Sequence, residues 1–354
     1  MQHANVLLAN SIALSSTTTY ESGLKRFKRF IERIATTHQQ PIPATHSPEA
    51  RRDLLALPVI TATFIASLAL EGLAAKTIGV YVAAVTHAAT DLHGHPAELP
   101  PGTKLVLRGA TLLGPLPRPP RPYIGLGLLK RMIAQLPSLF ESLWECTLYR
   151  AIFTTAFFGC FRVSEYLKSR DTEKCLQTGD VIILGEEQLI IRLKKTKSNQ
   201  HGNVQSVILL GRPEDPFTCP VRAMSCFLST SGWSVEHATR PLFINAAVPH
   251  GQTSSHALNR VIRQVLVSLG DVPEPSSYSS HCFRIGSSTE AAARGASIPD
   301  IKAMGRWNSD AVLVYLRAPA TRAAALRAQI SLRDVAPHLS QITSGPPPQT
   351  TPHT

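Results

Sequence analysis

Residues 14–110 carry apolar side chains at the spacing of amphipathic helices. On one face of LSSTTTYESGLKRFKRFIERIA, which begins at residue 14, apolar residues recur every three or four positions: Leu24, Phe27, Phe30, Ile31 and Ile34. We expect further helices at about 56–70 and in AAKTIGVYVAAVTHAATDL, after Gly72. Residues 54–70 hold no charge, but this is the short limit for a membrane span, and Pro58 interrupts it. A buried helix is therefore the favoured interpretation.

The pattern changes twice in the second half of the chain. Helical periodicity runs from Gly125 to about Leu167 and returns from Cys219 to about residue 331. Between these regions lie three β-rich runs, separated by GEE and KSNQHGN: Val181–Leu184, Leu189–Leu193 and Val204–Leu210. The expected fold class is α+β, mostly α, with a small three-stranded antiparallel sheet in the second half.

A proline-rich stretch, GPLPRPPRPY at 114–123, divides the two halves. Proline cannot continue a helix, so this stretch is expected to be a semi-extended linker. We place a helical domain at 1–113 and a mixed domain at 124–332. The remaining residues, 333–354, are rich in proline and threonine and are expected to be disordered.

The charge of the chain indicates the class of its partner. The formal net charge is +12, and both halves are positive. Such a balance favours a polyanionic partner, most often nucleic acid, although an inert basic surface has the same composition. Candidate DNA contacts are Lys25, Arg26, Lys28, Arg29 and Lys76. A solvated helix face explains the first four equally well.

Cysteine spacing and the N-terminus exclude several classes. Six cysteines include no C-x-x-C pair, which argues against a zinc ribbon or finger. Nothing in the sequence indicates a disulfide framework. The first residues lack the positive start of a signal peptide, so we do not expect secretion. We expect no metal and no membrane partner.

The stretch FFGCFRVSEYL places Arg162 and Glu165 at the end of an apolar helix. A buried arginine is costly unless it is paired or bound to an anion, so a structural Arg–Glu pair is the alternative to an anion site. Downstream, Lys194, Lys195 and Lys197 end a predicted strand. Lysines there often only protect a sheet edge.

His281 and Arg284 are three residues apart on a predicted helix and share one face. The next helix is predicted to begin in SIPD, with Ser297 as its N-cap, and to end at Gly305. A third helix would carry Tyr315. Taken alone, these helices also fit a helix-turn-helix DNA reader, and Tyr315 also fits a core aromatic residue.

Together these features occur in a specific order: G-x-x-R-x-S-E, a β-turn lysine, H-x-x-R-x-G, G-R-W and a tyrosine. This order closely resembles the tyrosine recombinase family of DNA breaking and rejoining enzymes, and the resemblance covers nearly the whole chain. The separation between Arg162 and His281 is 119 residues, and that between Arg284 and Tyr315 is 31. The H-x-F-R-x-G and G-R-W-x-S-D spellings look most like recombinases of eukaryotic mobile elements.

The resemblance implies a role for each matched residue. Cleaving a phosphodiester without a metal needs a nucleophile, cations for the phosphorane and a proton donor for the leaving oxygen. Tyr315 would be the nucleophile and Lys197 the general acid, preferred to its two neighbours. The other implied catalytic residues are Arg162, His281, Arg284 and Arg306, supported by Glu165 and Trp307.

One position departs from the family pattern. Arg306, nine residues before Tyr315, stands where the family usually has histidine or tryptophan. An arginine can bind phosphate there but cannot act as a neutral acid or base. Trp307, one residue further, could instead fill this position.

The resemblance also implies partners. The helical first domain would be a core-binding domain that grips duplex DNA together with the catalytic domain, without a cofactor. A homo-oligomer, a tetramer on paired sites, is implied, with nuclear localisation in a eukaryote and cytoplasmic localisation otherwise. The alternatives are an inactive DNA-binding descendant and a type IB topoisomerase-like enzyme.

Overall fold

The computed structural model of the chain describes residues 14–41, 45, 47–90, 97–115, 120–167, 175–194, 204–232, 238–244 and 253–314. Within these ranges the chain forms two compact units, which divide between Pro119 and Pro120. Each unit is described by itself. Two predicted catalytic residues, Lys197 and Tyr315, lie outside the described residues.

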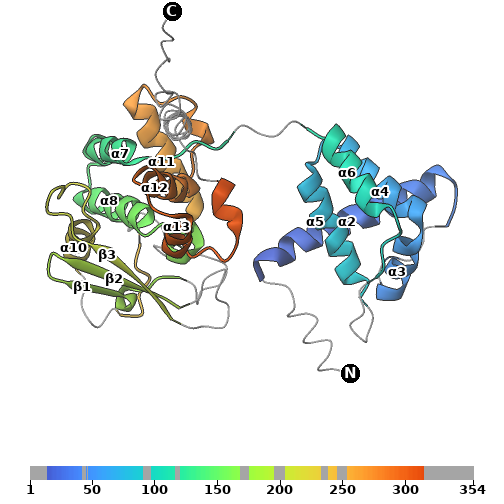
Figure 1. The fold of residues 1–354 in the computed structure, drawn as a ribbon, viewed down its shortest axis with the longest axis horizontal. Coiled ribbons are helices and arrows are strands. Elements are labelled where there is room, and N and C mark those ends of the chain that lie inside the picture. The colour runs from blue at the N-terminus through green and yellow to red at the C-terminus, as the bar shows by residue number, and fades with distance from the viewer. Residues whose placement is uncertain are drawn as a thin grey trace, which may run out of the picture. The chain divides into compact units, whose positions relative to one another are not determined.

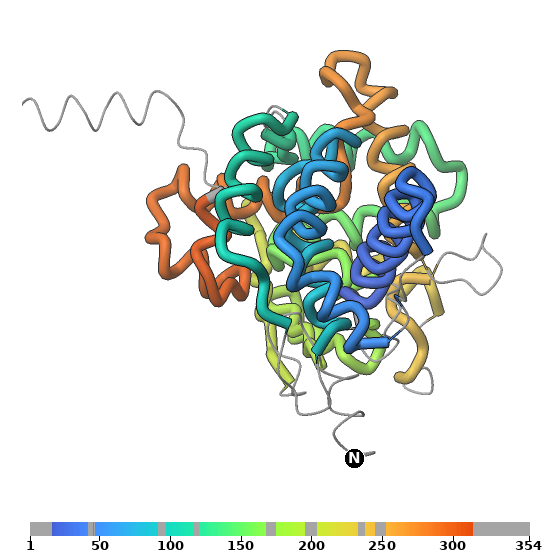
Figure 2. The backbone as a smooth tube through the Cα atoms, turned by 90° about the vertical axis from the view of Figure 1, so that its right-hand side faces the viewer, coloured from blue at the N-terminus to red at the C-terminus, as the bar shows by residue number. Residues whose placement is uncertain are grey.

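The first unit is helical (Figure 1). Its described helices are α2 (Leu14–Thr37), α3 (Pro48–Ala56), α4 (Pro58–Leu70), α5 (Ala75–Ala88) and α6 (Thr103–Leu113). Figure 2 shows the longer helices of this unit side by side. Apolar faces of α2, α4 and α5 enclose a core that includes Phe27, Phe30, Phe64, Ile65 and Ile78.

The charge-free stretch 54–70 forms the end of α3 and all of α4. Ser47 caps α3 by accepting a hydrogen bond from the backbone N of Ala50 at 3.1 Å, and Pro58 starts α4. Among the described residues no single helix is long and apolar enough to cross a membrane. Only α3 and α4 taken together reach that length, and they are bent by 91°.

The second unit surrounds the buried helix α8 (Leu143–Phe158), and Figure 1 shows its helices and sheet. The other described helices are α7 (Leu126–Leu139), α9 (Val163–Tyr166), α10 (Pro220–Thr230), α11 (Ser255–Leu269), α12 (His281–Ala293) and α13 (Ile298–Gly305). Short 3₁₀ segments are η2 (Thr178–Asp180), η4 (Pro275–Ser277) and η5 (Asp310–Val314).

The sheet consists of β1 (Val181–Leu184), β2 (Gln188–Leu193) and β3 (Gln205–Leu210), in the order β1-β2-β3. Both pairs are antiparallel, with Ile182 opposite Ile190 and Ile190 opposite Ile208. The expected fold class is confirmed, and each strand lies within one residue of its predicted bounds. One face, which includes Leu189 and Ile191, packs into the core.

The segment before α7 is attached to α12, and this contact explains one motif glycine. The backbone N of Ile124 donates to the carbonyl of Cys282 at 3.0 Å. A Cβ on Gly286 would lie 1.8 Å from the carbonyl oxygen of Ile124, so the glycine in H-x-x-R-x-G allows two backbones to approach closely. The start of α12, with His281, is thereby held beside residues 120–125.

Helix α13 begins and ends as predicted. Ser297 and Asp300 form a capping box, with proline in the first turn, and the helix ends at Gly305. The left-handed residue after it is Arg306, with φ 57° and ψ 47°. A Cβ on Gly305 would fall 1.7 Å from the ring of Trp307, so this glycine leaves space for the tryptophan.

Candidate active site

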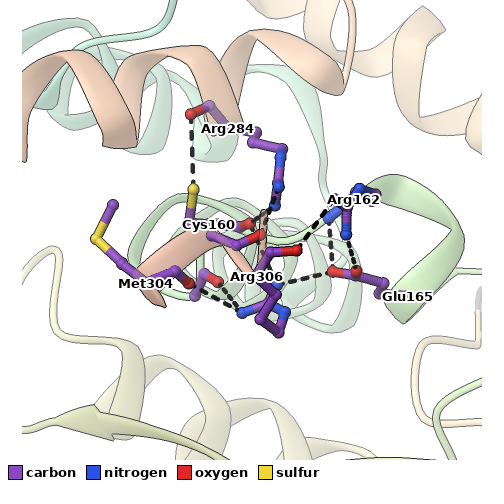
Figure 3. Close-up of polar contacts among 8 residues, drawn as sticks. Cys160, Arg162, Glu165, Arg284, Met304 and Arg306 are labelled. Atoms are coloured by element: carbon purple, nitrogen blue, oxygen red, sulfur yellow. Dashed lines mark hydrogen bonds and ion pairs between the residues drawn. The ribbon is translucent and has the colours of Figure 1, made fainter. Parts of the chain in front are cut away.

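Four of the six predicted catalytic residues lie within the described residues: Arg162, His281, Arg284 and Arg306. They come from the turn after α8, from α12 and from the turn after α13. Figure 3 shows the three arginines grouped around Glu165 and the backbone of Cys160. The fold therefore brings together residues that are more than a hundred positions apart in the sequence.

The turn after α8 supplies backbone acceptors to this group. Cys160 is buried and adopts the left-handed region with φ 47°, which is unusual for a residue with a Cβ. Its carbonyl accepts hydrogen bonds from Nη1 of Arg284 and from Nη2 of Arg306, the latter at 3.3 Å. One strained residue thus turns a single carbonyl toward two arginines.

Arg162 follows this turn and caps α9. Its Nη1 donates to Oε1 of Glu165 at 2.9 Å, and its backbone N donates to Oε2 at 2.9 Å. Burial acts to raise the pKa of Glu165, but Arg306, the backbone N–H of Arg162 and the Arg162 guanidinium together lower it. The ionised carboxylate is 2% exposed, whereas the Arg162 side chain is 21% exposed and reaches solvent.

Arg284 is 1% exposed and extends from the first turn of α12. Its Nη2 donates to the carbonyl of Gly305, and its guanidinium carbon lies 3.7 Å from the ring centroid of Trp307. Burial lowers the pKa of Arg284 to about 10, so the group remains a cation at neutral pH. Trp307 therefore acts as a buried stacking surface for this arginine.

Arg306 turns its side chain inward from the end of α13. Its Nη2 donates to Oε2 of Glu165 at 2.8 Å, and its guanidinium carbon lies 4.9 Å from the ring centroid of Phe161. The carbonyl of Arg306 accepts a hydrogen bond from Nη2 of Arg162 at 3.4 Å. The carbonyls of two adjacent residues, Gly305 and Arg306, therefore receive Arg284 and Arg162.

His281 begins α12 and is partly buried. Burial, together with the positive charges of Arg121, Arg284 and Arg162, lowers the pKa of His281 to about 4. The imidazole is therefore neutral at pH 7. An anion beside these cations would offset their charge and raise the pKa of His281 again.

The depressed pKa of His281 predicts a loss of stability in mild acid. Between pH 6.5 and about 4 the unfolded chain binds a proton at this position and the folded chain does not, so stability falls as the pH falls. We expect the wild type to lose about 1–2 kcal/mol more than His281→Asn between pH 7.5 and 5. Urea denaturation of both proteins at the two pH values measures this, and equal losses would contradict it.

The left-handed turn at Cys160 predicts an unusual order of tolerated residues. Cys160→Gly removes the steric cost of this backbone, whereas Cys160→Val puts a branched side chain into it. We expect the glycine variant within about 1 kcal/mol of the wild type and the valine variant at least about 2 kcal/mol less stable. Thermal denaturation tests this, and a valine variant as stable as the glycine variant would refute it.

The structure describes Lys194 and the five candidate DNA contacts, some of which form ion pairs. Lys194 is within an ion pair, with Nζ 3.1 Å from Oδ1 of Asp180, and donates to Oε1 of Gln177 at 2.7 Å. Arg26 forms an ion pair with Glu71. The remaining candidate contacts have exposed side chains: Lys25, Lys28, Arg29 and Lys76. Of these, Lys28 also pairs with Glu32 on the same helix, at 3.8 Å.

Sequence reasoning missed Arg121 and Cys160. Arg121 lies in the proline-rich stretch and adds positive charge near His281, because residues 120–125 are attached to α12. Its position among prolines gave no sign of this. Cys160 offered a weak signal, since it follows a glycine at a helix end, where left-handed residues are common.

The similarity of this chain to known proteins lies in its structure. No family model matches the chain, and no curated protein is similar to it in sequence. Among solved structures, the XerH site-specific recombinase bound to a palindromic difH substrate has a TM-score of 0.61 at 14% identity, over 89% of this chain and 80% of that chain.

Two further solved structures are similar in fold to this chain. The Tn1549 transposon integrase in complex with transposon right end DNA has a TM-score of 0.60 at 12% identity, over 92% of this chain and 97% of that chain. A lambda integrase dimer bound to a COC′ core site has a TM-score of 0.54 at 12% identity, over 89% of this chain and 75% of that chain. The chain therefore shares the fold of site-specific recombinases and integrases.

Proposed function

We propose that this chain is a site-specific DNA recombinase that cuts and rejoins strands through a 3′-phosphotyrosine at Tyr315. One observation carries the proposal: Arg162 and Arg284 are held by the adjacent carbonyls of Arg306 and Gly305, with His281 in their field. The fold shared with recombinases and integrases supports it.

In the proposed reaction, the hydroxyl of Tyr315 attacks the scissile phosphorus and gives its proton to the neutral imidazole of His281. A phosphotyrosine bond forms, the bond to the 5′-oxygen breaks, and Lys197 protonates that oxygen. The partly exposed Arg162 and the buried Arg284 supply positive charge to the phosphorane. Rejoining reverses these steps on a new 5′-hydroxyl, so the bond energy is conserved.

The general acid can be tested with a matched control. A thiolate leaving group needs no proton, so Lys197→Ala should regain cleavage on a substrate whose leaving oxygen is replaced by sulfur. Lys194→Ala should show a smaller defect, because Lys194 already pairs with Asp180. Equal defects for both variants, or no recovery with sulfur, would move the general acid elsewhere.

The proposed partner is double-stranded DNA, and the proposed assembly is a tetramer on paired sites. Four exposed residues are proposed to contact the DNA backbone: Lys25, Lys28, Arg29 and Lys76. A mobile-element origin and nuclear localisation rest on the G-R-W-x-S-D spelling and belong to the proposal.

The decisive experiment captures the covalent intermediate. Duplexes with random central sequences and a nick near the cleavage position are incubated with the protein, and SDS-resistant complexes are sequenced. The nick lets the short fragment that carries the freed 5′-hydroxyl diffuse away. Rejoining is then prevented, and the phosphotyrosine accumulates. Binding without an adduct would indicate an inactive descendant, and relaxation of supercoiled DNA lacking the selected site would indicate a topoisomerase.

A further inference from the structure

We infer that Arg306 is a positioning residue, which holds Arg162 through Glu165 and does not itself contact the scissile phosphate. The inference rests on the proposed function and assigns the position at which this chain departs from the family pattern.

The first argument is the direction of the side chain. Arg306 follows the last turn of α13 in the left-handed conformation, and its backbone N–H closes that turn on the carbonyl of Ala303 at 3.1 Å. The side chain is only 6% exposed, against 21% for Arg162. The two guanidinium groups therefore differ in access, and of the two Arg162 is the one that a phosphate in solvent can reach. Burial alone does not separate Arg306 from Arg284, which is 1% exposed.

The second argument counts acceptors. Each terminal nitrogen of an arginine carries two N–H bonds. Nη1 of Arg306 meets the carbonyls of Gly159 at 3.2 Å and Met304 at 3.1 Å. Nη2 meets the carbonyl of Cys160 at 3.3 Å and Oε2 of Glu165 at 2.8 Å. Four acceptors match four N–H bonds, so a phosphate could bind these nitrogens only by displacing protein contacts.

The third argument is the link to Arg162. Glu165 uses Oε2 for Arg306 and for the backbone N of Arg162, and uses Oε1 for the Arg162 guanidinium. The backbone carbonyl of Arg306 accepts from the same guanidinium. Arg306 therefore fixes Arg162 through its side chain and through its backbone, as Figure 3 shows. If the Arg306 side chain were removed, Glu165 would lose the more buried of its two arginine partners.

The test is a double-mutant cycle on the single-turnover rate of adduct formation. Arg306→Ala should slow the wild type by at least about tenfold, but should slow Arg162→Ala by less than about threefold, because coupled residues are not additive. Arg306→Lys should be nearly as slow as Arg306→Ala, since one ammonium cannot meet four separated acceptors. Lys302→Ala, on the same helix, is the matched control and should keep the wild-type rate.

Equal slowing by Arg306→Ala in both backgrounds, with near-normal cleavage by Arg306→Lys, would overturn the inference and indicate a direct phosphate contact. A parallel cycle on urea midpoints, with Arg306→Ala and Glu165→Ala, tests the link without DNA. The double variant should lose less than the two single variants combined, and additive losses would overturn the link. A wild type that forms no adduct would overturn the proposed function, and the urea cycle would then decide the link alone.

Discussion

Replacing Tyr315 with phenylalanine is expected to abolish the covalent protein–DNA adduct while leaving DNA affinity nearly unchanged. Only the phenolic oxygen is removed, and that oxygen is the proposed nucleophile. Tyr315 lies outside the described residues, but the chain that leads to it is anchored. Val312, three residues earlier, is fully buried in one cluster with Cys160, Ile301 and Trp307. The tyrosine therefore follows a segment that is fixed beside the turn holding the arginines.

The measurement is gel separation of SDS-resistant complexes on the nicked duplex, with affinity measured in parallel. Tyr123→Phe is a suitable control, because Tyr123 is a 39% exposed phenol in the same unit and should keep the wild-type adduct level. Mass spectrometry of the wild-type adduct should place the nucleotide on the peptide containing Tyr315. An adduct formed by the phenylalanine variant would exclude this tyrosine as the nucleophile.

Arg284→Ala is expected to slow cleavage by at least ~10²-fold, the scale of losing one contact to transition-state charge. The same change should destabilise the fold by about 2–5 kcal/mol, because it strips the carbonyls of Cys160 and Gly305 of a charged donor and leaves a cavity beside Trp307. Rates must therefore be compared at a temperature where both proteins are folded, as monitored by circular dichroism.

A neutral substrate separates the two effects. A methylphosphonate at the cleavage position carries no charge on its phosphorus centre, so an arginine that neutralises this charge is needed less. The gap between wild type and Arg284→Ala should shrink by at least about tenfold on this substrate. Arg284→Lys, which keeps a cation, should cleave at a rate between those of the wild type and Arg284→Ala. An unchanged gap in a folded variant would make Arg284 a structural residue only.

Local sequence predicted the elements that carry the site. Three β-rich runs separated by polar turns located the three strands within one residue, because β-branched and apolar side chains favour a half-buried pleated surface. Ser297, proline and Asp300 located the start of α13, since a capping box is complete within four residues. His281 and Arg284 lie on one helix, α12, as the sequence predicted.

The sequence pattern was less informative where a boundary depends on a longer segment. The helix expected at about 56–70 proved to be preceded by α3, which begins at Pro48. Its apolar face is short, and its burial depends on contacts with α4 and α5. Residues 103–113, placed only within a generally helical region, form a separate helix, α6.

The sequence by itself determined the fold class, the strands, and the set of residues from which a site could be built. It left open whether Arg162 pairs with Glu165 or binds an anion, and whether Arg306 faces a substrate. Tertiary structure decided that the Arg162–Glu165 pair is present, that Arg306 turns inward to Glu165, and that Cys160 offers its carbonyl to two arginines. The physical reason is the range of the interactions. A cap or a strand face is set by neighbours a few residues away, whereas a buried guanidinium is oriented by carbonyls that lie more than a hundred residues away in the chain.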